Sequence, residues 1–255
     1  MKHEEKLATL LLEIEQFFTD HAQVLLAAQC ARFFKEGYDA YGIPEKLLHV
    51  KAQQWSQAHA DLGLQGFLDL GDRLWQSGMY EEGSLAILFI IPFRREVDWK
   101  TFVRLGNWLS SGVRNWAHTD LLCGELLSHC LVNEIVPLQA LASWRASSSK
   151  WKRRAVPVSM LGLLKTGEGI DTLLEFIRPL MLDDERVVQQ GLGWFLKEAW
   201  KKYPKPVEKF LLEWKDSAPH LIFQYASEKM SPEKRARFRV EKRKPVAGAK
   251  AFDIV

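Results

Sequence analysis

The stretch TDLLCGELLSHCL, residues 119–131, carries apolar side chains at spacings of three and four residues. This spacing matches the 3.6-residue period of an α-helix that buries one face. The same period runs through most of the chain, for example in LATLLLEIEQFF (7–18), DTLLEFIRPLML (171–182) and GWFLKEAWKK (193–202). No stretch alternates apolar and polar residues between turn residues, as the strands of a hairpin do. The sequence therefore predicts an all-α protein, divided by turn residues into about twelve helices.

A second regularity concerns the places where helices begin. The predicted helix starts at Tyr80, Trp116, Trp151 and Val187 are separated by 36, 35 and 36 residues. Five positions after each start stands an aliphatic residue: Leu85, Leu121, Val156 and Leu192. Two positions after each start stands a polar residue: Glu82, His118, Arg153 and Gln189. Columns of this kind indicate helix pairs stacked side by side, so we predict a HEAT-like helical-repeat solenoid. His118 is expected to point outward and is given no role.

The charge is unevenly distributed along the 255 residues. The chain has a formal net charge of +3, but its basic excess is concentrated between residues 228 and 244. The remainder is slightly acidic, so a DNA-binding surface there must come from a local cluster. We predict one helical-repeat domain over residues 1–228 and a basic C-terminal tail over 229–255. The tail is either a mobile, solvated terminus or an arm that adds affinity for DNA.

Several classes of protein are disfavoured by the sequence. The longest apolar run, Leu85–Phe93, is about half as long as a membrane span requires. The N-terminal stretch has acidic residues among its apolar ones, so it predicts an amphipathic helix and not a signal peptide. Three cysteines without a CxxC pair indicate reduced thiols and no structural zinc. We therefore expect a cytoplasmic protein that does not associate with a membrane.

Four residues fall on one stripe of the predicted repeats. Trp116 is at position 0 of its helix and Asp120 at position 4, while Arg154 and Trp194 are at positions 3 and 7 of theirs. These offsets share one face of a helix, and in a solenoid the same faces of adjacent repeats lie side by side. We predict that two indoles, a carboxylate and a guanidinium line one groove. The alternative is that the tryptophans are packing residues and that Asp120 forms a structural ion pair with Arg154 or Lys197.

Basic residues accompany this stripe. The run from Arg145 to Arg154 contains no acid and includes Lys150, Lys152, Arg153 and Arg154, and Lys197 follows Trp194 by about one turn. We predict a strip that binds phosphates. Indole faces beside a carboxylate suit a cation. Together they indicate a nucleic acid that carries a positively charged base. Because Pro157 interrupts backbone hydrogen bonding, the helix that carries Arg154 either bends or begins later.

Four segments in order carry a resemblance to a known family. RNWAHTD (114–120), KWKRRAV (150–156) and QQGLGWFLKEAWKKYP (189–204) resemble the AlkD-like family of alkylpurine DNA glycosylases. CARFFKEGYDAYGIP (30–44) is similar to the early helix of that family and its Gly-Ile turn. The likeness covers roughly residues 20–228. Phe33 stands where the family pattern leads us to expect a tyrosine, so a hydroxyl contact to the DNA backbone is absent there.

The resemblance implies a HEAT-like superhelix with a concave DNA-binding groove. It also implies removal of N3- and N7-alkylated purines from duplex DNA by hydrolysis of the N-glycosidic bond, without a deep base-flipping pocket. By this resemblance Trp116 and Trp194 contact the lesion and its sugar, Asp120 stabilises the sugar cation and places water, and Arg154 holds the backbone. A cationic purine departs as a neutral base, so we expect no general acid, metal or cofactor.

Two other functions remain open from the sequence. A non-catalytic HEAT-like protein that binds branched or bent DNA needs the basic strip but not Asp120. A scaffold for protein interactions needs neither. For the glycosylase we expect alkylated duplex DNA as the partner, and a monomer, because a solenoid can wrap a duplex alone.

Overall fold

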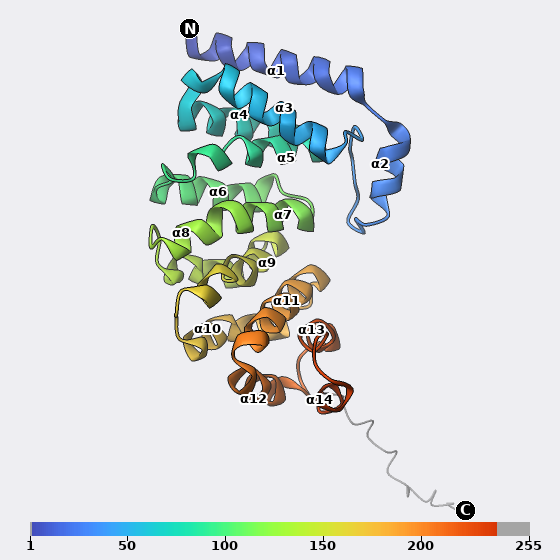
Figure 1. The fold of residues 1–255 in the computed structure, drawn as a ribbon, viewed down its shortest axis with the longest axis vertical. Helices are drawn as coiled ribbons and strands as arrows, with labels where there is room; N and C mark the ends of the chain where they lie inside the picture. Colours follow the sequence, from blue (N-terminus) through green and yellow to red (C-terminus); the bar gives the residue numbers. More distant parts are fainter. Residues whose placement is uncertain (1, 239–255) are drawn as a thin grey trace, which may run out of the picture.

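The computed structural model describes residues 2–238, and within that range every regular element is a helix (Figure 1). This confirms the predicted all-α fold. The fourteen α-helices of the described residues are α1 (Lys2–His21), α2 (Val24–Ala31), α3 (Glu45–Ala58), α4 (Gly63–Ser77), α5 (Tyr80–Leu88), α6 (Trp99–Ser111), α7 (Trp116–Leu122), α8 (Ser128–Val132), α9 (Lys150–Ser159), α10 (Ile170–Ile177), α11 (Arg186–Lys202), α12 (Pro204–Trp214), α13 (His220–Ala226) and α14 (Pro232–Ala236). None of the described helices is long and apolar enough to cross a membrane.

Short tight helices connect several of these elements. They are η1 (Ala60–Leu62), η2 (Ile91–Phe93), η4 (Leu138–Ala146), η5 (Gly162–Lys165) and η6 (Arg178–Leu182). The segment η3 (Cys123–Leu127) is a π-helical insertion that joins α7 directly to α8. Helical periodicity does not reveal such an insertion, since it adds only one residue to a turn.

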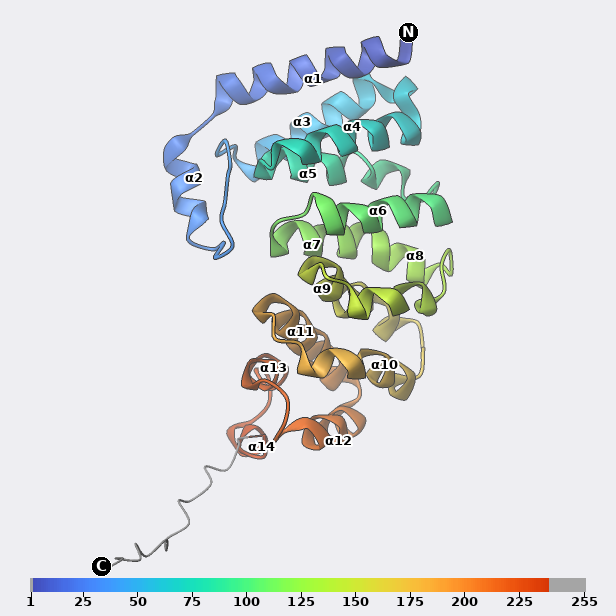
Figure 2. The same ribbon diagram turned by 180° about the vertical axis from the view of Figure 1, so that it is seen from behind.

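The helices are piled one above another along the long axis, from α1 to α13 (Figures 1 and 2). In this pile α5, α7, α9, α11 and α13 contact one another in succession. The described chain therefore has an all-α helical-repeat fold, as the sequence predicts. The succession matters for the candidate site, because it places α9 between α7 and α11 and in contact with both.

The predicted register of the repeats is confirmed. Helices α5 and α7 begin at Tyr80 and Trp116 as predicted, and α9 and α11 begin one residue before their predicted starts. Leu85, Val156 and Leu192 of the aliphatic column are fully buried, and Leu121 is partly buried against the core. The column is buried because it faces the neighbouring helices at every repeat.

The polar column differs from expectation at two of its positions. His118 is 3% exposed and Gln189 is 8% exposed, so the prediction that His118 points outward is wrong. Both side chains are buried because the surrounding chain supplies hydrogen-bond partners. The side-chain amide of Gln189, for example, donates to the carbonyl oxygen of Asp183 at 2.8 Å.

Helix α9 begins one residue before the start that the repeat predicted, and it accommodates its proline near the end. Ser149 caps the helix: its hydroxyl oxygen accepts from the backbone N–H of Lys152 at 3.3 Å. Pro157 lies two residues before the last helical residue, Ser159. The alternative that this helix begins later than predicted is therefore wrong. Arg154 lies on a regular part of the helix, three residues ahead of the proline.

The first part of the segment predicted as a tail packs on the body. Lys234 on α14 and Arg237 beyond it donate to the carboxylate of Glu208 at 2.8 and 2.7 Å. Phe238 is 2% exposed, with its ring centroid 6.4 Å from that of Phe223. Residues 239–255, the rest of the predicted tail, lie outside the described residues.

Candidate active site

Asp120 and Arg154 form a bidentate pair between α7 and α9. The Nε and Nη2 atoms of Arg154 donate to the two carboxylate oxygens of Asp120 at 2.9 and 2.8 Å. The Nη1 atom donates to the backbone carbonyl oxygen of Val187 on α11 at 2.6 Å. The Arg154 side chain is 6% exposed and that of Asp120 19%. The guanidinium thus ties α7, α9 and α11 together, while the carboxylate keeps some access to solvent.

The environment of Asp120 has two opposing effects on the pKa of its carboxyl group. Burial raises the pKa of the Asp120 carboxyl above its ordinary value, and the hydrogen bonds and positive charge of Arg154 lower it. Burial is the larger effect. The ionised form of Asp120 therefore depends on Arg154.

A glycine on α11 leaves room for the arginine. A methyl group on Gly191 would lie 3.2 Å from Cγ of Arg154, closer than side chains ordinarily pack. The stem of Arg154 therefore lies directly against the α11 backbone, which allows the guanidinium to reach the carbonyl oxygen of Val187. The sequence motif QQGLGW, residues 189–194, thus places its first glycine where the arginine crosses the helix.

Trp116, at the start of α7, is held by a segment far away in sequence. Its indole N–H donates to the carbonyl oxygen of Phe33 at 3.2 Å. Its ring is stacked on Phe34, with centroids 5.5 Å apart and an interplanar angle of 16°. Tyr38 stacks on Phe34 at 4.5 Å and 14°. Sequence reasoning missed these aromatic neighbours, because helical periodicity carries no signal for contacts across 83 residues.

Trp194 lies two turns into α11 and is half-buried against the core. The residue before it, Gly193, is packed directly on Tyr225 of α13. One turn earlier, the side-chain amide of Gln190 donates to the Tyr225 hydroxyl at 2.8 Å. The position of Trp194 is therefore set by the close approach of α11 and α13.

His118, one turn before Leu122 in α7, is a packing residue. The carboxamide of Asn115 donates to its Nδ1 atom at 2.9 Å, and its Nε2 atom lies 2.9 Å from the carbonyl oxygen of Tyr80. Asn115 is fixed in this orientation because its carbonyl oxygen accepts from the His118 backbone N–H at 2.8 Å. The imidazole is therefore neutral, with its proton on Nε2.

The buried imidazole gives a prediction about stability and pH. Burial lowers the pKa of His118 to about 4, from 6.5 in the unfolded chain. Between these values the unfolded state binds a proton that the folded state does not, so stability falls as the pH decreases, by up to about 1.4 kcal/mol per pH unit. Urea denaturation from pH 7 to 4.5 should show a steeper loss for wild type than for His118→Gln. The exposed His220→Gln is the control. Parallel curves for wild type and His118→Gln would contradict the assignment.

Most of the predicted phosphate-binding residues have acidic partners. Ion pairs join Lys150 to Glu185 at 3.6 Å, Arg153 to Asp183 at 2.6 Å and Lys197 to Glu228 at 3.0 Å. Arg153 also donates to the carbonyl oxygen of Ser147 at 2.7 Å. The ion pair of Asp120 with Arg154, which the sequence left as an alternative, is formed. Contact of these cations with DNA stays a prediction.

Lys152 differs from its neighbours in having no ion pair within residues 2–238. Its ammonium lies 5.3 Å from the ring centroid of Trp144, a cation–π distance. Burial lowers the pKa of Lys152 below its ordinary value. Of the predicted basic strip, Lys152 is the residue whose charge no carboxylate of the described chain offsets.

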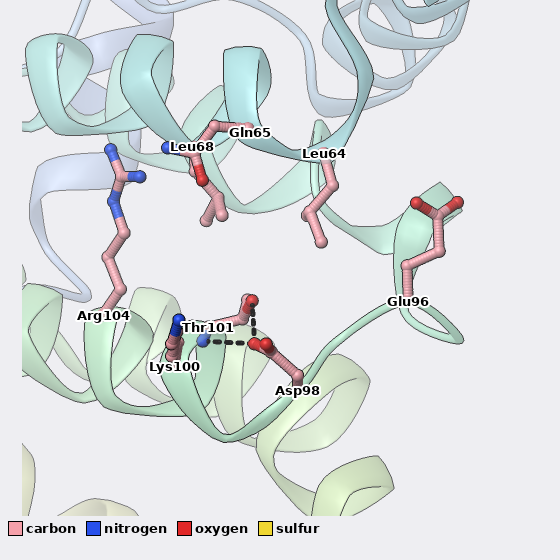
Figure 3. Close-up of a pocket in the computed structure, with 8 residues that line it drawn as sticks. All are labelled: Leu64, Gln65, Leu68, Glu96, Asp98, Lys100, Thr101 and Arg104. Carbon is pink, nitrogen blue, oxygen red and sulfur yellow. Dashed lines mark hydrogen bonds between the residues drawn. The ribbon is translucent and has the colours of Figure 1, made fainter.

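A hollow elsewhere on the surface does not involve these residues. It lies between α4 and α6, has a volume of about 370 Å³, and is lined by the residues drawn in Figure 3. One of them, Asp98, caps α6 by accepting from the backbone N–H and hydroxyl of Thr101, both at 2.8 Å. Arg104 on its wall is paired with Asp69 at 2.7 Å. This hollow is thus lined in part by helix-capping and ion-pairing residues, and contains none of the predicted site residues.

Comparison with known proteins identifies the class of the chain. The family described as DNA alkylation repair enzyme matches residues 14–230. A solved structure described as a predicted DNA alkylation repair enzyme from Enterococcus faecalis has a TM-score of 0.72 and 16% sequence identity, covering 83% of this chain and 98% of that one. No curated protein matches the chain. The shared fold agrees with the family match.

The chain belongs to the DNA alkylation repair enzyme family. The family membership inferred from RNWAHTD, KWKRRAV and QQGLGW is thereby confirmed. Membership of this family supports a role in DNA repair and an enzymatic activity with DNA as the substrate.

Proposed function

We propose that this protein is a DNA glycosylase that removes positively charged N3- and N7-alkylated purines from duplex DNA by hydrolysing the N-glycosidic bond. The observation that carries the proposal is Asp120. Its carboxylate is largely buried, is held in a fixed orientation by Arg154, and follows Trp116 by one turn of α7. A fixed carboxylate beside an indole, in a chain of this repair family, suits a reaction that moves positive charge onto a sugar.

The chemistry of the substrate explains why a single carboxylate suffices. An N3- or N7-alkylated purine is cationic and leaves the sugar as a neutral base, so the leaving group needs no proton from an acid. As the bond breaks, positive charge moves to the deoxyribose. A preoriented carboxylate stabilises that charge, by about 3 kcal/mol on the scale of one electrostatic group. The same carboxylate accepts a hydrogen bond from the attacking water.

The neighbouring residues take distinct parts in this scheme. Trp116 and Trp194 present indole faces to the cationic base and its sugar, which they attract through their π-electrons. Arg154 acts on Asp120: its two hydrogen bonds orient the carboxylate and favour the ionised form. Lys152 supplies positive charge toward the DNA phosphates. Additional positive charge comes from Lys150, Arg153 and Lys197 when their ion pairs with carboxylates open.

The deciding experiment is base release from methylated duplex DNA by the wild-type protein, with binding to the same duplex measured in parallel. Release of 3-methyladenine or 7-methylguanine, identified by chromatography, is the expected result. Binding without release would favour the alternative, a non-catalytic protein that recognises bent or branched DNA. If the protein neither binds the duplex nor releases a base at physiological salt, the remaining function is that of a scaffold for protein interactions.

Arg154→Gln gives a prediction about pH. Without the guanidinium, the effect of burial on Asp120 is no longer opposed, so the carboxyl pKa rises further. Because only the ionised form stabilises the sugar cation, the acid limb of base release should move to higher pH. We expect release at pH 6 to fall at least ~10-fold and the loss to shrink at pH 8. A uniform loss at every pH would contradict this role for Arg154.

A further inference from the structure

The chain leaves the helical pile between residues 24 and 40 and returns to it. Figures 1 and 2 show α2 standing beside the other helices. The two ends of this excursion are joined by a hydrogen bond: the Gln23 backbone N–H donates to the carbonyl oxygen of Tyr41 at 2.8 Å. We call this junction, around Gln23 and Tyr41, the neck. Gly42, with φ of +80°, sits against Gln23 so closely that a side chain would overlap its carbonyl group.

A buried carboxylate anchors the neck to α5. Glu81 is 1% exposed, and its oxygens accept from the backbone N–H groups of Tyr41, Gly42 and Ile43 at 2.9, 2.8 and 3.0 Å. Just before it, the backbone N–H of Tyr80 donates to the carbonyl oxygen of Asp39 at 2.7 Å. Both ends of the excursion are therefore fixed on the rim of the pile, next to the start of α7.

Between its anchored ends the segment buries little. No residue of α2 is buried, and Val24, Leu25 and Phe33 are 81%, 80% and 59% exposed. Its apolar contact with the pile is aromatic: Phe34 stacks on Trp116, and both Phe34 and Tyr38 lie against Tyr80, at 5.4 and 4.9 Å between centroids. The segment is thus held away from the core except where it meets Tyr80 and Trp116.

We propose that Phe34 is a positioning residue of the candidate active site, which it serves by fixing the ring plane of Trp116. The proposal rests on the proposed function. Phe34 covers one face of the indole and the Phe33 carbonyl takes up its N–H, so the ring has one orientation and only its other face meets the lesion. Trp116 is the first residue of α7, and the helix backbone by itself allows its side chain more than one rotamer.

The requirement is for a flat ring at position 34. Leucine at this position keeps an apolar side chain but cannot stack, whereas tyrosine keeps the stacking surface. Reaction rates depend steeply on the placement of groups around the reacting bond, so a loosened Trp116 should slow the chemical step more than it weakens binding. The segment that carries Phe34 lies 83 residues from the helix it organises.

The test compares Phe34→Leu and Phe34→Tyr with Leu25→Ala, a control on α2 whose exposed side chain is remote from the ring stack. Single-turnover base release at saturating enzyme and the Kd for unmodified duplex are measured for each. We expect Phe34→Leu to slow release ~10- to 100-fold with Kd within ~2-fold of wild type. The rate of base release by Phe34→Tyr should be within ~3-fold of the wild-type rate, and Leu25→Ala should release the base at the wild-type rate.

A second readout reports on the ring itself. The indole N–H resonance of Trp116, assigned by its loss in Trp116→Phe, should shift in Phe34→Leu and stay in place in Leu25→Ala. This measurement decides the stacking even when no base is released, so a failure of the proposed function is separable from a failure of this inference. Wild-type rates in Phe34→Leu would overturn the proposal, as would a loss confined to Kd. Phe34→Tyr as slow as Phe34→Leu would overturn the requirement for a ring.

Discussion

Replacing Asp120 with asparagine should lower base release by at least ~100-fold while leaving duplex binding within a few-fold of wild type. Asparagine retains the shape of the side chain and one acceptor for Arg154, but it removes the negative charge that stabilises the developing sugar cation. The measurement is the single-turnover release of methylated purines at saturating enzyme, beside a binding isotherm for the same duplex.

The chain offers a matched control for this substitution in a second Asp–Arg–Trp set. Asp72 on α4 accepts from the Trp108 indole N–H at 2.6 Å and also pairs with Arg104, both on α6. Asp72→Asn therefore breaks a comparable carboxylate–guanidinium pair away from the candidate site. Because the Asp72 side chain is 46% exposed and that of Asp120 is 19% exposed, the melting temperature of Asp72→Asn should fall no more than that of Asp120→Asn, with base release unchanged. Equal loss of release in both variants would assign the effect to stability and remove Asp120 from the chemistry.

Gly193→Ala should lower the free energy of unfolding by about 2–3 kcal/mol, the upper part of the range for overpacking a tight contact. A methyl group here would overlap Cβ of Tyr225 and lie 2.9 Å from the carbonyl oxygen of Ile222, and the backbone of α13 cannot yield as a flexible side chain would. Helix α11 would be pushed away from α13, and Trp194, the next residue, would move with it. Urea denaturation monitored by circular dichroism gives the stability.

Gly124→Ala is the control for adding a methyl group to a helical glycine. Gly124 is exposed within η3, and nothing lies within 4 Å of the position its Cβ would take. Alanine favours a helix over glycine by up to about 1 kcal/mol, so this variant should be as stable as wild type or slightly more stable. A loss at Gly124 equal to that at Gly193 would show that the close approach of α11 and α13 is not the cause.

Sequence alone determined the helical character of the chain and the register of its repeats. The starts at Tyr80 and Trp116 were predictable because apolar spacing reports which face of each helix is buried. The repeat of about 36 residues then aligned Asp120 with Arg154, and the pair is formed in the structure. The apolar spacing and the repeat length can both be detected in the sequence without knowing which distant residues are in contact.

Tertiary structure alone decided how polar groups were satisfied and what surrounds the site. His118 is buried because Asn115 and the Tyr80 carbonyl provide hydrogen-bond partners for its two ring nitrogens. A polar residue recurring at one position of the repeat does not reveal such partners. Phe34 reaches Trp116 because Glu81 fixes the neck of the excursion that begins with α2. Contacts of this kind depend on the packing free energy of the whole chain, and no spacing within either segment encodes them.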